Sequence, residues 1–164
     1  MHDPKLLAEA EALLAACRAA GLTIATAESC TGGLVAGTLT AIAGSSDVLD
    51  RGFVTYSNAA KTEMLGVPAA LIETEGAVSE AVACAMAEGA LRHSPASLSV
   101  SITGIAGPGG GSATKPVGLV WFGLARRGGA VRTRRREISG DRTAVRHAAV
   151  AEALALLRDA VSVG

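Results

Sequence analysis

The sequence predicts an α/β fold, a single three-layer α/β/α domain over residues 1–164 built around a mixed, mostly parallel sheet. Two observations support this prediction. Segments with the apolar periodicity of helices alternate with short apolar segments typical of buried strands, which indicates helices on both faces of a sheet. Toward the C-terminal end, two strand-like segments follow one another directly, which predicts a β-hairpin. The 164 residues contain no linker or internal repeat and are enough to bury one core.

The first part of the chain alternates helix, strand and helix. Apolar residues at spacings of three and four predict a helix over residues 4–20, which ends at Gly21. Residues 22–27 are predicted to form a short buried strand, and residues 30–43 a second helix. Ser29 would therefore lie at a strand-to-helix junction, beside backbone N–H groups that the first helical turn leaves free.

The middle of the chain is predicted to contain a loop, a strand, two short helical segments and a longer helix. These segments cover residues 44–50, 51–56, 58–66, 68–73 and 79–92. Asn58 is expected to cap the first of the helices, which carries Lys61 and ends at Gly66. Ser79 is expected to cap the longer helix, whose inner face carries small side chains suited to close packing.

The last part of the chain supplies the hairpin and a final helix. A strand over residues 98–102 leads into a glycine-rich loop over residues 103–112. The hairpin strands are predicted over residues 117–125 and 131–138. Asp141 is expected to cap the final helix.

The charge balance argues against a nucleic-acid or membrane partner. The formal net charge is zero and the pI is about 6.8, so no overall field attracts polyanions. A local basic run, with arginines at 132, 134, 135 and 136, is expected on an exposed strand. No apolar stretch approaches the roughly 20 residues that a membrane span needs.

The cysteine content and the N-terminal sequence indicate a cytoplasmic protein. The three cysteines are an odd number without a Cys-x-x-Cys pair, which argues against a disulfide framework. The first residues lack the pattern of a signal peptide. The histidines are scattered and no residues have the spacing of metal ligands, so neither a metal nor a cofactor is expected.

Two adjacent residues are candidate nucleophiles. Ser29 is predicted to follow a strand and precede a helix, where N–H groups and the helix dipole would stabilise an oxyanion. The alternative is that Ser29 only caps the helix, with Gly32 and Gly33 allowing close packing. Cys30 is a rival nucleophile, because a helix N-terminus lowers the pKa of a thiol.

Lys61 is the candidate base. The chain has three lysines against twelve arginines, and a buried lysine can lose its proton whereas a guanidinium does not. A serine and a lysine that the fold brings together can act as nucleophile and base. Ser29, Thr103 and the only tyrosine, Tyr56, all fall at predicted strand ends, where ligands of parallel sheets bind. The alternative for Lys61 is a solvated helix residue.

Two further features could bind an anion. The loop from Thr103 to Ser112 holds five glycines, whose N–H groups could surround a phosphate, although the loop could equally be a flexible connection. Neither a Walker A motif nor a dinucleotide-binding fingerprint is present. Arg142 and Arg146, one turn apart on the final helix, could clamp a phosphate or carboxylate, or form a surface pair.

Six ordered motifs resemble the C-terminal domain of the competence/damage-inducible protein CinA. They are Glu28-Ser29-Cys30-Thr31-Gly32-Gly33, Tyr56-Ser57-Asn58-Ala59-Ala60-Lys61, Gly76-Ala77-Val78-Ser79, the segment from Ser101 to Gly110, Lys115-Pro116-Val117-Gly118, and Gly140-Asp141-Arg142 with Arg146. The resemblance covers nearly the whole chain. It implies a three-layer domain that hydrolyses nicotinamide mononucleotide to nicotinic acid mononucleotide and ammonia, in pyridine-nucleotide salvage.

The resemblance also implies roles for individual residues. Ser29 would be the nucleophile and Lys61 the base, with Tyr56 and Thr103 near the reacting centre. Backbone groups of Cys30, Thr31, Gly32 and Gly33 would bind the oxyanion, and the glycine loop (Gly104, Gly107, Gly109 and Gly110) with Arg142 and Arg146 would bind the rest of the substrate. The expected partner is a pyridine nucleotide, and a homo-oligomer is expected. The alternatives are a pyridine-nucleotide-binding protein without turnover and a partner protein in DNA uptake or repair.

Overall fold

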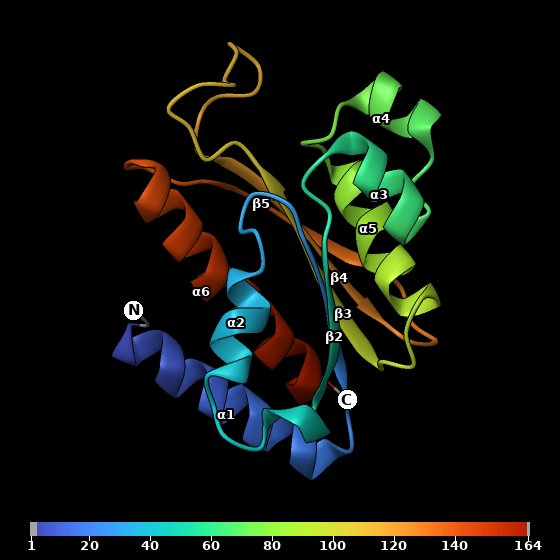
Figure 1. The fold of residues 1–164 in the computed structure, drawn as a ribbon, viewed down its shortest axis with the longest axis vertical. Coiled ribbons are helices and arrows are strands. Elements are labelled where there is room, and N and C mark those ends of the chain that lie inside the picture. The colour runs from blue at the N-terminus through green and yellow to red at the C-terminus, as the bar shows by residue number, and fades with distance from the viewer. Residues whose placement is uncertain (1–2, 164) are drawn as a thin grey trace.

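The computed structural model describes residues 3–163, which form a five-stranded sheet between two layers of helices (Figure 1). The strands are β1 Ile24–Glu28, β2 Leu49–Val54, β3 Leu98–Gly104, β4 Leu119–Arg126 and β5 Arg132–Glu137. They lie in the order β2-β1-β3-β4-β5. β1 runs parallel to both of its neighbours, whereas β4 runs antiparallel to β3 and β5. The predicted α/β class, mixed sheet and C-terminal hairpin are confirmed.

A layer of helices lies on each side of the sheet (Figure 1). Those on one face are α1 Pro4–Ala20, α2 Leu34–Thr40 and α6 Arg142–Val163, and those on the other are α3 Asn58–Leu65, α4 Ala69–Glu75 and α5 Glu80–Arg92. The apolar side chains form two buried clusters, one under each layer. Successive strand residues alternate between them: Ile24 belongs to the first cluster, and Ala25 and Ala27 to the second.

The α5 face of β3 carries hydroxyls instead of apolar side chains. Ser99 and Ser101 donate to the carbonyl oxygens of Ala87 and Ala83 of α5, both at 2.6 Å. Each buried hydroxyl is thereby satisfied, and the short side chains let the helix approach the sheet closely. Because α5 lies against the sheet, the α3–α4 pair is held near the strand ends.

Several element boundaries differ from those predicted. α2 begins at Leu34 rather than near residue 30, because Gly32 and Gly33 adopt positive φ values of 57° and 100° that no α-helix contains. α3 is capped by Ser57 rather than Asn58, since the Ser57 hydroxyl accepts from the Ala60 N–H at 3.0 Å. β2 begins two residues earlier than predicted, directly after a short 3₁₀ helix over Ser45–Asp47.

The basic run lies on β5, at one edge of the sheet. Arg134 and Arg136 both contact the Glu152 carboxylate of α6, at 2.7 and 3.2 Å, and Arg135 contacts Glu137. This arrangement agrees with the predicted exposed strand. Three of the four arginines therefore take part in ion pairs within the fold.

We predict that Gly89→Ala destabilises the protein and Gly37→Ala does not. A Cβ on Gly89 of α5 would clash with the carbonyl oxygen of Leu65, the last residue of α3, whereas a Cβ on Gly37 of α2 meets nothing within 4 Å. Overpacking against backbone lowers the free energy of unfolding by roughly 1–3 kcal/mol, and glycine-to-alanine in an open helix raises it by up to about 1 kcal/mol. Chemical denaturation measures both values. Equal effects of the two substitutions would contradict the close α3–α5 contact.

Candidate active site

Residues from three neighbouring strand ends surround one cleft of about 210 Å³. Ser29 follows β1, Tyr56 follows β2, and Thr103 lies near the end of β3. Because these strands are parallel, their carboxyl ends meet at one edge of the sheet. The cleft is lined by Ser29, Cys30, Tyr56, Asn58, Lys61, Ala77, Val78, Thr103, Gly104, Ala106 and Arg142.

Lys61 is buried in this cleft, with 1% of its surface exposed. Its Nζ lies 3.1 Å from Ser29 Oγ, 3.0 Å from the carbonyl oxygen of Thr55 and 3.4 Å from that of Tyr56. The predicted meeting of Ser29 and Lys61 is present in the structure, and the alternative of a solvated Lys61 is wrong. The cap at Ser57 fixes this geometry, because it sets where α3 starts after β2.

The surroundings of Lys61 favour its neutral form. Burial lowers the pKa of Lys61 below its ordinary value of 10.5. No carboxylate of residues 3–163 forms an ion pair with it. A neutral amine would donate to the two carbonyl oxygens and accept from the Ser29 hydroxyl through its lone pair. In this state the Ser29 hydroxyl donates to Lys61 Nζ, the arrangement that a general base requires.

The nucleophile turn, defined as residues 29–33, is fixed at several points. The Ser29 N–H donates to the Ile102 carbonyl at 2.9 Å, which continues the pairing of β1 with β3. The Gly32 N–H donates back to the Ser29 carbonyl at 3.0 Å and closes the turn. Within residues 3–163, the N–H groups of Cys30, Thr31 and Gly33 have no acceptor. These three groups are the donors that the turn can offer to a ligand.

The first turn of α2 does not supply free N–H groups as the sequence predicted. The carboxylate of Glu28, 1% exposed, accepts from the N–H groups of Val35 and Ala36 at 2.9 and 3.1 Å. Glu28 thereby replaces the side-chain cap that Gly33, at the N-cap position, does not provide. No role was predicted for Glu28 from the sequence, although a carboxylate between a buried strand and a helix start is a signal for one.

Cys30 lies in the cleft but is not activated. Burial, the largest effect, raises the pKa of its thiol to about 11, and the Glu28 carboxylate acts in the same direction. The expected lowering by a helix N-terminus is absent because α2 starts four residues later and its N–H groups are taken. A thiol in this state is protonated at neutral pH and is a poor nucleophile.

The two arginines of α6 bind different parts of the site. Arg142 lines the cleft and donates to the Tyr56 hydroxyl at 2.9 Å and to the Gly107 carbonyl at 2.8 Å. Arg146 donates to the carbonyl oxygen of Cys30 at 3.0 Å and to that of Thr31 at 3.4 Å. Their guanidinium groups thus do not form a joint clamp, and neither is a free surface group. Each fixes a loop that borders the cleft.

The predicted loop residues divide between the cleft and its surroundings. Thr103 donates its hydroxyl proton to the Ala77 carbonyl at 2.8 Å and so holds the cleft wall. Gly104 lines the cleft, and Gly107 borders it through its contact with Arg142. Gly109 and Gly110 are exposed and are not among the residues that line it. Four residues that were not predicted as site residues also line the cleft, namely Asn58, Ala77, Val78 and Ala106.

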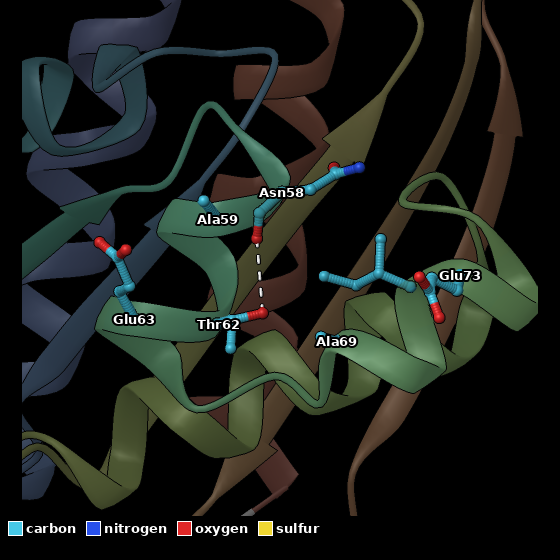
Figure 2. A pocket seen from close by; sticks show the side chains of 7 residues that line it. Asn58, Ala59, Thr62, Glu63, Ala69 and Glu73 are labelled. Carbon is cyan, nitrogen blue, oxygen red and sulfur yellow. Dashed lines mark hydrogen bonds between the residues drawn. The ribbon is translucent and has the colours of Figure 1, made fainter.

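A second, larger hollow of about 330 Å³ lies between α3 and α4 (Figure 2). Its lining is mostly apolar, and the Thr62 hydroxyl within it donates to the Asn58 carbonyl at 3.5 Å. It brings together no nucleophile and base. The smaller cleft is therefore the candidate active site, and Asn58 lines both spaces.

A sequence model of the CinA C-terminal domain matches residues 7–161. The chain belongs to the CinA C-terminal domain family. A family member from Escherichia coli K12, nicotinamide-nucleotide amidohydrolase PncC, is 54% identical over 157 residues, which are 96% of this chain and 95% of the relative. The Enterobacter agglomerans protein of the same name is 58% identical over 132 residues, 80% of each chain.

Solved structures of CinA family members have the same fold. The crystal structure of the competence/damage-inducible protein CihA from Agrobacterium tumefaciens superposes with a TM-score of 0.94 at 49% identity. The match covers 99% of this chain and 98% of that one. The described fold is therefore that of the family, from the first helix to the last.

We predict that Cys30 resists alkylation in the native protein. At about pH 8 its thiol is protonated and buried, as is that of Cys17, whose pKa burial also raises to about 11. Iodoacetamide followed by mass spectrometry should modify both only after unfolding, while the half-buried Cys84 reacts first. Rapid modification of Cys30 by iodoacetamide in the folded protein would instead support the Cys30 thiol as the nucleophile.

Proposed function

We propose that this chain hydrolyses the carboxamide of nicotinamide mononucleotide to nicotinic acid mononucleotide and ammonia by a serine-lysine mechanism. The observation that carries the proposal is the 3.1 Å contact between buried Lys61 Nζ and Ser29 Oγ inside the cleft. The names of the two relatives, which match most of their length, support the substrate. The proposal includes a role in pyridine-nucleotide salvage.

The first step forms an acyl-enzyme. Neutral Lys61 takes the Ser29 proton while Oγ attacks the carboxamide carbon and forms a C–O bond. The amide oxygen gains negative charge, and the free N–H of Cys30, a residue that lines the cleft, is the donor of the nucleophile turn placed to stabilise it. The C–N bond then breaks, and the proton held by Lys61 passes to the departing nitrogen, which leaves as ammonia.

The second step returns the enzyme to its starting state. Water loses a proton to Lys61 and attacks the nicotinoyl carbon, the C–O bond to Ser29 breaks, and Ser29 regains a proton. The Tyr56 hydroxyl is an alternative acid for the leaving group, because its oxygen accepts from Arg142 and its own proton stays available. On the protein side, every proton transfer uses Lys61, Ser29 or Tyr56, which line the cleft.

The cleft walls suit the substrate. Ala77, Val78 and Ala106 present small apolar surfaces for a pyridine ring. Arg142 uses two of its five donors on Tyr56 and Gly107, which leaves others for the ribose phosphate together with the glycine loop. Binding of the remote phosphate would orient the carboxamide at Ser29. We assign positioning roles to Thr103 and Arg146, whose side chains bind backbone carbonyls.

The proposed location is the cytoplasm. Cys17, Cys30 and Cys84 are all free thiols, as is usual in a reducing compartment. Among residues 3–163, no helix has the length and apolar character needed to cross a membrane. The homo-oligomer and the absence of a nucleic-acid partner stay predictions.

We predict that ammonia release from nicotinamide mononucleotide depends on Ser29 and Lys61 but not on Cys30. Ser29→Ala and Lys61→Arg should lower kcat by roughly a thousand-fold or more, since the second variant keeps a charge but removes the base. Cys30→Ala should retain most activity. An assay of ammonia and of nicotinic acid mononucleotide measures all three. Saturable binding by wild type without ammonia release would instead indicate a binding protein.

We also predict that kcat/KM rises with pH. Lys61 accepts the serine proton only when neutral, so activity is lost as the pH falls through its lowered pKa. The midpoint should lie below 10.5, the ordinary value. Lys5→Arg, on the exposed side of α1, is the control and should leave the profile unchanged. A midpoint near the ordinary lysine value would argue against Lys61 as base.

A further inference from the structure

We propose that Glu28 is a positioning residue for the Ser29 nucleophile, an inference that rests on the proposed serine-lysine chemistry. Glu28 is the last residue of β1 and directly precedes Ser29. Its backbone lies between the two neighbouring strands: it is paired with Ile102 of β3, and its carbonyl accepts from the Thr55 N–H at 2.9 Å. Its side chain binds a third element, the first turn of α2.

The contacts of Glu28 close the nucleophile turn at both ends. The turn leaves β1 at Ser29 and enters α2 at Leu34, and the carboxylate joins the strand to the N–H groups of Val35 and Ala36. Arg146 holds the outer carbonyls of the same turn. The path between these anchors is therefore fixed, and with it the position of Ser29 Oγ relative to Lys61 Nζ.

The residue type is set by reach and by hydrogen-bond polarity. A buried carboxylate is tolerated only when its oxygens are satisfied, and here each oxygen accepts one backbone N–H. Glutamine would present an NH₂ group to one of these donors. Aspartate keeps the charge but is shorter by one methylene, so it cannot reach both N–H groups from the same backbone position.

The expected effect is on the chemical step. A misplacement of about 1 Å in a reacting group lowers a rate by about a hundred-fold. Glu28→Gln and Glu28→Asp should therefore lower kcat by about 10- to 100-fold while KM changes by less than about two-fold, because Glu28 does not line the cleft. A fluorophosphonate phosphonylates Ser29 Oγ with loss of fluoride, and the rate of this labelling should fall together with kcat.

A second helix cap provides the control. Asp3 caps α1 by accepting from the Lys5 N–H at 2.8 Å and also contacts His147 of α6 at 3.0 Å, and neither side chain lines the cleft. Asp3→Ala removes a cap and lowers stability as Glu28→Gln does, yet should leave kcat and the labelling of Ser29 at wild-type values. Thermal unfolding of every variant shows that the assays are performed on folded protein.

The outcomes separate this inference from the proposed function. Slow turnover or slow labelling in both Glu28 variants, with Asp3→Ala normal, supports positioning. If Glu28→Gln keeps the wild-type kcat and labelling rate, at any melting temperature, Glu28 acts only as a helix cap and the proposal is wrong. A normal Glu28→Asp beside a slow Glu28→Gln would show that charge matters and reach does not, which overturns the proposal.

If wild type releases no ammonia but Ser29 is labelled, the amidase proposal fails and the labelling rates still decide the role of Glu28. If neither occurs, both proposals fall.

Discussion

The site depends on a lysine buried without a carboxylate partner. A protonated ammonium at the position of Lys61 would lose its hydration and gain only carbonyl and hydroxyl contacts in return. Burial therefore shifts Lys61 toward the neutral amine, whose lone pair can accept from the Ser29 hydroxyl. The surrounding structure serves this placement: the Ser57 cap sets the start of α3, and α5 packs tightly against the end of α3 at Gly89.

The opposite wall of the site is the nucleophile turn, whose first three carbonyl oxygens are hydrogen-bonded. Between β1 and α2, the carbonyls of Ser29, Cys30 and Thr31 all have donors, and the N–H groups of Val35 and Ala36 have an acceptor in Glu28. What the turn leaves unpaired is a small set of N–H groups next to the nucleophile. The N–H groups of Val35 and Ala36 are therefore used by the fold, whereas the unpaired N–H groups of the turn stay available to a substrate. The sheet order contributes, because β1 lies between β3, which contains Ile102, and β2, which Thr55 directly follows.

The order of the helices and strands and the contact between Ser29 and Lys61 could be predicted from the sequence. Apolar periodicity predicted the helix over residues 4–20, and the scarcity of lysine drew attention to Lys61. Hydrogen bonds between side chains and backbone groups far apart in the sequence could not be predicted. Arg146 looked like an anion ligand because it follows Arg142 by one turn, yet it binds backbone carbonyls of the nucleophile turn. The start of α2 was misplaced because the positive φ angles of Gly32 and Gly33 depend on contacts that periodicity does not report.

The proposed mechanism depends most directly on the protonation state of Lys61. The chain contains only three lysines, so NMR of protein labelled with ¹³C at the lysine side chains should resolve one Cε signal for each. We predict that one signal titrates below 10.5, the ordinary lysine value, and that this signal disappears in Lys61→Arg. Titration of the Lys61 signal at or above the ordinary lysine value would show a charged Lys61 and contradict its role as a base.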